Sequence, residues 1–133
     1  NDAAIEQTAL SLLDTLNLSH VAASRAGDLA YGLQRRLEIA RALATSPKLL
    51  LLDEPAAGMN PQEKQELREL ILEIRQKFDI TIMLIEHDMK VVMGLCERIY
   101  VLDYGQIIAE GNPEAIRSNP KVIAAYLGQE EAA

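Results

Sequence analysis

Four consecutive leucines, Leu49 to Leu52, constrain the fold of this 133-residue chain more strongly than any other feature. An unbroken aliphatic run of this length is typical of a β-strand that is buried on both faces, as in a parallel sheet. Ile80 to Ile85 forms a second run of this kind. Between the runs, Asn60 and Pro61 are a helix cap and a first helical residue, and Glu63 occupies the capping-box position. This order of patterns predicts an α/β fold with a mainly parallel sheet.

The rest of the chain alternates between helical and strand patterns. Residues 3–17 have the 3.6-residue period of an amphipathic helix, and residues 17–28 are predicted to form a loop. The apolar stripe of that helix consists of Ile5, Ala9, Leu12, Leu13 and Leu16. Further helices are predicted over residues 33–45 and after the capping residues Asp88, Asn112 and Asn119. Residues 98–103 and 106–109 predict a hairpin that turns at Tyr104 and Gly105.

Charge and composition exclude several classes of protein. The net charge is −7, whereas a non-specific nucleic-acid binder needs a cationic surface, so no nucleic-acid partner is expected. The aliphatic runs are far too short to span a bilayer. Cys96 is the single cysteine, which excludes an intrachain disulfide. We expect Cys96 to be a small residue of the core. The start of the chain, Asn1 to Ala4, is neither basic nor apolar, so we expect no signal peptide and a reducing, soluble compartment.

Two adjacent carboxylates, Asp53 and Glu54, follow the leucine run directly. Ligands of parallel sheets bind at the carboxyl ends of the strands. Asp53 is placed to hold Mg²⁺, directly or through water, because this ion prefers oxygen ligands and keeps several waters. Glu54 is placed to accept a proton from an attacking water. The alternative is a charged pair that merely ends a strand, which the aliphatic run before it and Pro55 after it disfavour.

A histidine, His87, follows the second aliphatic run. If the two strands are neighbours, Glu54 and His87 project from the same edge of the sheet. A histidine there can donate a hydrogen bond to a developing phosphate charge and position the water. An isolated histidine would more often be structural, and His20, which has no such context, is expected to be a surface loop residue.

The helix start at Ala30, Tyr31, Gly32 and Leu33 is the third candidate site. Free backbone N–H groups and the helix dipole attract phosphate, and a glycine lets the backbone approach closely. Arg35, Arg36 and Arg41 are expected to form a solvated helix face with Glu38. For Arg36 and Arg41 the alternative is contact with a partner surface. Gly27 and Gly32 have the spacing of a P-loop, but Leu33 and Gln34 follow instead of Lys and Ser or Thr, and no P-loop occurs elsewhere.

Taken in order, these motifs resemble the ABC-type ATPase family over essentially the whole chain. Leu29 to Leu33 is similar to its signature motif, and Leu49 to Glu54 is similar to Walker B. His87 corresponds to the switch histidine. The residues similar to the D-loop are Ala57, Gly58, Met59 and Asn60.

The details resemble one branch, the ATP-binding subunits of high-affinity branched-chain amino acid importers. The similar stretches are Leu-Ala-Tyr-Gly before Gln-Arg-Arg-Leu-Glu, Asp-Glu-Pro-Ala-Ala-Gly-Met-Asn-Pro, Ile-Glu-His-Asp-Met-Lys and Asn-Pro-Lys-Val-Ile-Ala-Ala-Tyr-Leu-Gly. Ala30 stands where the family generally has Ser, and Asn60 stands where it generally has Asp, both as in this branch. Leu33 departs from the family, which has a polar residue there, usually Gln.

The resemblance implies a partial P-loop NTPase fold in three parts. Residues 1–45 would belong to the helical subdomain, residues 46–128 to the carboxy-terminal part of the ATPase core, and residues 129–133 to a tail. Walker A, the Q-loop and an aromatic base contact would lie upstream, so the chain is expected to be an excised or truncated piece that cannot hydrolyse ATP alone.

The resemblance also implies cofactors and partners for the intact protein. ATP and Mg²⁺ would be bound between two ATPase subunits in a head-to-tail dimer, with the signature of one facing the nucleotide of the other. Transmembrane permease subunits would hold the dimer on the cytoplasmic face of the membrane. Sheet edges left uncovered would favour self-association of the chain alone. The alternatives are a non-transport ABC ATPase acting in DNA repair or translation and a non-enzymatic half that docks on a P-loop half.

Overall fold

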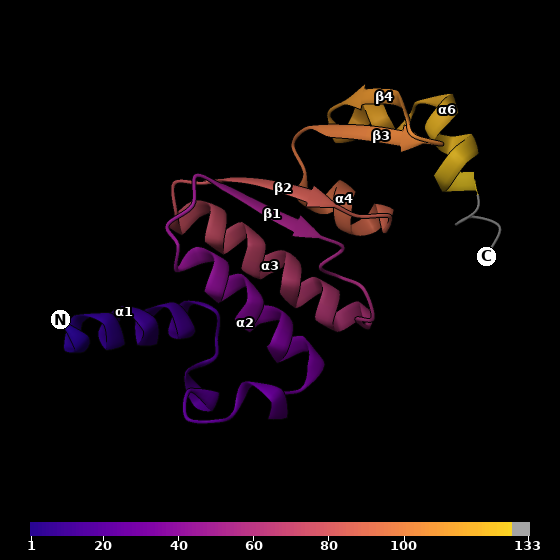
Figure 1. The fold of residues 1–133 in the computed structure, drawn as a ribbon. Helices are drawn as coiled ribbons and strands as arrows, with labels where there is room; N and C mark the ends of the chain where they lie inside the picture. The colour runs from indigo at the N-terminus through magenta and orange to yellow at the C-terminus, as the bar shows by residue number, and fades with distance from the viewer. Residues whose placement is uncertain (129–133) are drawn as a thin grey trace.

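The computed structural model describes residues 1–128, which form an α/β fold with two small sheets (Figure 1). The tail predicted over residues 129–133 lies outside the described residues. The helices are α1 (Asp2–Thr15), α2 (Tyr31–Leu43), α3 (Pro61–Lys77), α4 (Met89–Leu95), α5 (Pro113–Arg117) and α6 (Pro120–Val122). The strands are β1 (Leu49–Asp53), β2 (Thr81–Ile85), β3 (Ile99–Asp103) and β4 (Gln106–Gly111). Short 3₁₀ turns lie at Ser19–Val21 and Ala26–Asp28, and a π-helical turn at Ile123–Leu127.

The two aliphatic runs form a parallel pair, as predicted. β1 and β2 pair in register from Leu49 with Thr81 to Asp53 with Ile85. α3 connects them, and its start has the predicted capping box, in which Asn60 Oδ1 accepts from the Glu63 N–H at 2.8 Å and Glu63 Oε1 accepts from the Asn60 N–H at 3.2 Å. The parallel register brings the carboxyl ends of both strands to one edge.

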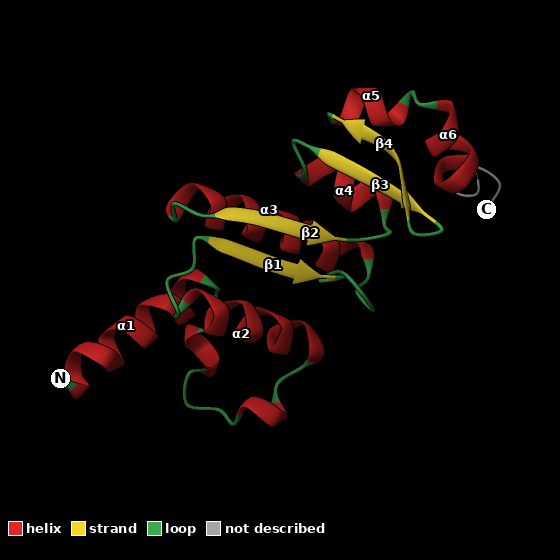
Figure 2. Cartoon of the chain, turned by 45° about the horizontal axis from the view of Figure 1, so that its top comes forward, coloured by secondary structure: helices red, strands yellow, loops and turns green. Residues whose placement is uncertain are grey.

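The prediction that these strands are buried on both faces is wrong. Leu50 and Leu52 lie in the main core, but Leu51 is 63% exposed and Met83 is 54% exposed. The physical reason is that α2 and α3 cover one face of the β1–β2 sheet and leave the other uncovered within residues 1–128 (Figure 2). An apolar groove of about 790 Å³ runs from β2 to β3, with Met83, Ile85 and Leu102 in its lining.

The predicted hairpin is present. β3 and β4 are antiparallel with an irregularity between Val101 and Leu102, and the turn residues Tyr104 and Gly105 both have positive φ. Residues from α4, β3, α5 and α6 form a second core, separate from the main one. Its buried members are Met89, Val92, Ile99, Val101, Ile116 and Val122.

The amino-terminal helix packs less than its pattern predicts. Leu16 and Leu18 are fully buried beyond the end of α1, but Ile5 is 67% exposed. Only the carboxyl end of α1 approaches the other helices, and its start points away from them (Figures 1 and 2). None of the helices in residues 1–128 has both the length and the apolar character that a membrane span requires.

Candidate functional site

The turn after β1 presents the first candidate carboxylate. The Glu54 backbone adopts φ 47°, in the left-handed region, and its N–H donates to the carbonyl of Ile85 at 2.7 Å. This bond extends the pairing of β1 with β2 by one residue beyond Asp53. Glu54 is thereby fixed at the edge where both strands end.

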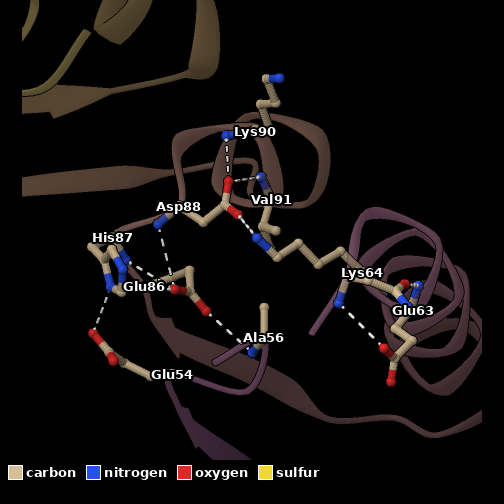
Figure 3. Close-up of polar contacts among 10 residues, drawn as sticks. Glu54, Ala56, Glu63, Lys64, Glu86, His87, Asp88, Lys90 and Val91 are labelled. Atoms are coloured by element: carbon tan, nitrogen blue, oxygen red, sulfur yellow. Dashed lines mark hydrogen bonds and ion pairs between the residues drawn. The ribbon is translucent and has the colours of Figure 1, made fainter. Parts of the chain in front are cut away.

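Glu54 and His87 are in contact across that edge. The prediction that both residues project from the same edge is confirmed, and His87 Nδ1 lies 2.8 Å from Glu54 Oε1 (Figure 3). Both are accessible to solvent, with 42% of the Glu54 side chain and 71% of the His87 side chain exposed. The hydrogen bond with the Glu54 carboxylate raises the pKa of His87 above its ordinary value. The pair therefore consists of a carboxylate that is accessible to water and a histidine whose pKa is raised.

Sequence reasoning missed Glu86, whose side chain is only 1% exposed. Its carboxylate accepts from the backbone N–H groups of Ala56 at 3.3 Å, His87 at 3.1 Å and Asp88 at 3.4 Å (Figure 3). The available signal was its position immediately before His87, but nothing in the sequence indicated that Ala56 would be a partner.

Asp53 ends β1 with an exposed side chain. Glu54, Glu86 and His87 bring potential metal-ligand atoms within 4.8 Å of one another, and Asp53 lies outside that group. The group suits Mg²⁺ poorly, because it contains a nitrogen ligand and Glu86 is already occupied by backbone N–H groups. Asp53, an accessible carboxylate at the end of a strand, fits an oxygen-binding ion better.

The start of α2, the third site predicted from the sequence, lacks a side-chain cap. Ala30 is its N-cap and makes no side-chain capping bond, whereas every other α-helix in residues 1–128 is capped by an Asn or Asp side chain. Tyr31 is half exposed and its hydroxyl accepts from Arg35 Nε at 3.0 Å. Leu33, which departs from the family's usual polar residue, is partly buried and packs against the main core.

The arginines of α2 are engaged within the chain. Arg35 contacts Tyr31, and Arg36 pairs with Glu66 at 3.3 Å while also donating to the Leu16 carbonyl. These contacts link α2 to α3 and to the end of α1. Arg41 is exposed.

The D-loop residues form a tight turn beside the start of α2. The N–H of Ala57 donates to the Glu54 carbonyl at 3.1 Å, and that of Met59 to the Ala56 carbonyl at 3.2 Å. Gly58 has φ 76°, and a Cβ there would lie 3.5 Å from the Tyr31 ring. Gly32, in the first turn of α2, faces the first turn of α3, where a Cβ on it would lie 3.2 Å from Glu63 Oε2. The signature-like and D-loop-like segments therefore pack on each other within one chain.

An ion pair joins α3 to the segment that carries His87. Lys64 Nζ contacts Asp88 Oδ2 at 2.7 Å, and Asp88 Oδ1 caps α4 through the N–H groups of Lys90 and Val91. The hydrogen bond to Asp88 raises the pKa of Lys64, partly offset by burial. Burial on its own raises the pKa of Asp88, but the bonds from Lys64 and Val91 outweigh it and the pKa is lowered.

Comparison with known proteins places this geometry in a family. Residues 1–57 match the family model described as ABC transporter, and residues 106–132 match the model described as branched-chain amino acid ATP-binding cassette transporter. The chain is 56% identical over 121 residues to the high-affinity branched-chain amino acid transport ATP-binding protein LivG of Escherichia coli, covering 91% of this chain and 48% of LivG. It is 53% identical over 117 residues to BraF of Pseudomonas aeruginosa, which carries the same description, covering 88% of this chain and 46% of BraF.

A solved structure agrees with the sequence relatives. The ADP conformation of MJ1267, an ATP-binding cassette of an ABC transporter, superposes with a TM-score of 0.82 at 38% identity, covering 92% of this chain and 49% of that one. The chain thus spans about half the length of the relatives it matches. Its family models, its relatives and the meeting of Glu54 with His87 at the end of a parallel strand pair agree, and the chain belongs to the ABC transporter ATP-binding family.

Proposed function

We propose that the chain is part of the ATP-hydrolysing subunit of an ABC importer, with branched-chain amino acids as the transported substrates. The observation that carries the ATPase proposal is the 2.8 Å contact between Glu54 and His87 at the open edge of the β1–β2 pair. The substrate rests on the names of LivG and BraF and on the match of residues 106–132.

Each side chain at this edge has a distinct role in the proposed reaction. Glu54 accepts the proton of the attacking water, because its carboxylate is accessible and fixed at the strand end. His87 orients that carboxylate through Nδ1 and presents its other ring nitrogen to solvent, where it can donate to the phosphate charge. Asp53 would hold Mg²⁺, directly or through water, and the bound ion would neutralise developing charge on the phosphates.

The start of α2 and the D-loop would serve the nucleotide of a second subunit. The backbone N–H groups of Tyr31, Gly32 and Leu33 are free of a capping side chain and carry the positive end of the helix dipole. The D-loop, from Ala57 to Asn60, packs beside them and would contact the same partner. This assignment follows the family resemblance and the head-to-tail dimer it implies.

A complete ATP site needs a P-loop, which the 133 residues do not contain. We infer that a P-loop-bearing part packs on the exposed face of the β1–β2 sheet and in the adjoining groove, where Leu51, Met83 and Ile85 are uncovered. Permease subunits would then hold the assembly at the cytoplasmic face of the membrane. Residues 1–45 would belong to the helical subdomain, and residues 46–128 to the carboxy-terminal part of the ATPase core.

A chimera tests the proposal directly. The matching region of Escherichia coli LivG is replaced by this chain, and the purified chimera is assayed for ATP hydrolysis. We expect turnover by the chimera and none by the 133-residue chain alone, because the P-loop supplies much of the positioning and charge stabilisation. Leucine uptake by cells that carry the chimera in place of LivG tests the importer assignment.

Two variants of the chimera sharpen the result. Glu54→Gln should lower turnover by roughly a hundred- to ten-thousand-fold while ATP still binds, since the base is lost and the shape is kept. Glu73→Gln, on the exposed side of α3, is the matched control and should leave turnover unchanged. A folded chimera that binds ATP without hydrolysing it, or magnesium-dependent turnover by the pure chain alone, contradicts the proposal.

A further inference from the structure

The Glu86 carboxylate has no role in the reaction proposed above, yet it is the most deeply buried charged side chain at the edge. Only 1% of the side chain is exposed. Burying a carboxylate costs free energy unless hydrogen bonds replace its water, and here three backbone N–H groups do so. These bonds in turn hold the three backbone N–H groups in place.

The two oxygens of Glu86 serve two different loops. Oε2 accepts from the N–H of Ala56, in the turn that carries Glu54. Oε1 accepts from the N–H groups of His87 and Asp88, in the loop after β2. Figure 3 shows the carboxylate lying between the two loops, with the Glu54–His87 contact beside it. The Glu86 side chain therefore connects the backbone of the turn that carries Glu54 to the backbone of the loop that carries His87.

We propose that Glu86 is a positioning residue for ATP hydrolysis, which clamps the Glu54 turn to the His87 loop and so fixes the distance between the two side chains. The inference rests on the proposed function, because the clamp matters only if Glu54 and His87 act on a bound nucleotide. Without the clamp, the remaining backbone bond between the loops is the one from the Glu54 N–H to Ile85. That bond holds the turn at Glu54, whereas the backbone at Ala56 is held by Glu86.

Two other roles for Glu86 fit the geometry less well. It is a poor general base, because solvent water does not reach a side chain with 1% exposure. It is also a poor metal ligand, because both oxygens already accept backbone N–H groups. A clamp explains both the burial and the use of both oxygens.

Glu86→Gln in the LivG chimera tests the clamp with little change in volume. Glutamine has one acceptor oxygen, so it can serve one loop while its NH₂ group faces the N–H of the other. We expect kcat to fall about 10- to 100-fold, as displacement of reacting groups by about 1 Å does. The KM for ATP should stay within about twofold, because ground-state binding is untouched. Glu73→Gln is again the control, and a kcat for Glu86→Gln that equals this control overturns the proposal.

Amide hydrogen exchange gives a readout that does not depend on activity. In Glu86→Gln, exchange should accelerate about tenfold or more at Ala56 and His87, while β3 and β4 keep their rates. Unchanged exchange at both amides overturns the clamp whether or not the chimera hydrolyses ATP. If the unmutated chimera lacks turnover, the proposed function fails and the positioning role fails with it. Faster exchange together with unchanged kcat rejects positioning and leaves a purely structural carboxylate.

Discussion

Glu54 holds its backbone at φ 47°, a region that costs a residue with a Cβ about 1 kcal/mol or more. The conformation persists because two hydrogen bonds fix the turn. The Glu54 N–H donates to the Ile85 carbonyl, and the Glu54 carboxylate is bonded to His87 Nδ1. An extended backbone at this residue would continue the strand and carry the carboxylate away from His87. The strain is thus coupled to the contact that the proposed chemistry needs.

The hydrogen bond with Glu54 predicts how His87 titrates. The pKa of His87 is raised, first by this bond and then by the charge of Glu54. The stability that the contact contributes is therefore fully present below the unfolded histidine pKa, about 6.5, and is lost as pH rises through the folded value. We expect Glu54→Gln to lower the His87 pKa, as measured by NMR titration of the ring protons in the chimera.

The signal of His20, the only other histidine of this chain, distinguishes a local from a general effect. His20 is exposed and lies in the 3₁₀ turn at Ser19–Val21. Its ring-proton signals at neutral pH should be the same in both proteins. A His87 titration that does not move in Glu54→Gln would show that the contact is absent in solution.

At the scale of single residues, the sequence predicted the motifs and one of the contacts between them, but not the others. The contact of Glu54 with His87 was predictable, because each follows an aliphatic run and parallel strands end at one edge. The clamp by Glu86 was not, since one of its partners is the backbone of Ala56, thirty residues away. Leu33 was singled out because its motif usually has a polar residue there, but the packing of its side chain on the main core depends on tertiary structure.

Among the elements, α4 depends on one residue for both its start and its attachment. Asp88 caps the helix with Oδ1 and pairs with Lys64 of α3 through Oδ2. The capping signal was visible in the sequence, but the ion pair was not, because it depends on how α3 packs. The same side chain therefore fixes the helix that follows His87.

Two substitutions at Asp88 separate its roles. Asp88→Asn keeps a good cap and loses the ion pair, which should cost about 1 kcal/mol, because Lys64 is about one third exposed and water screens the pair. Asp88→Ala loses both and should cost about 1–3 kcal/mol. Urea unfolding of the chimera measures both, with the exposed Asp79→Asn as the control. Equal losses for Asn and Ala would mean that the cap contributes nothing.

The lowered pKa of Asp88 gives this prediction a pH dependence. Its stabilising contribution is present above the unfolded aspartate pKa, about 3.9, and disappears as pH falls through the folded value. The difference in stability between the unmodified protein and Asp88→Asn should therefore shrink in acid. If this difference in stability stays constant as the pH falls below the folded pKa of Asp88, the ionised Asp88 carboxylate is not its source.

Element order was predictable because caps and aliphatic runs are local signals, while exposure was not. The sequence placed β1, α3, β2, α4 and the hairpin close to their observed bounds. The same leucine run was predicted to be buried on both faces. Such a run indicates that both faces of the strand are apolar, but it does not identify which part of the protein covers each face. Which face α2 and α3 cover is decided by tertiary packing.

The whole molecule presents a broad apolar surface made of one face of β1–β2 and the groove beside it. Leu49, Leu51, Met83 and Ile85 are each at least half exposed there. We expect the chain alone to self-associate, since contiguous apolar patches of this kind drive association. Light scattering with Leu51→Lys should show a smaller average mass than the unmodified chain.

Ile5→Lys is the matched control, because Ile5 is equally exposed but lies on α1, away from the sheet. This variant should associate as the unmodified chain does. If both variants reduce association equally, the effect comes from added charge and the sheet face is not the contact. A monomeric unmodified chain would also contradict the prediction.

The two cores of the molecule are separate, and α4 belongs to both. Val91 and Leu95 lie in the main core, whereas Met89 and Val92 lie in the core of the hairpin. This helix therefore connects the two cores, and its N-cap residue, Asp88, directly follows His87. We expect a displacement of the hairpin relative to the strand pair to shift α4 and, through Asp88, the loop that carries His87.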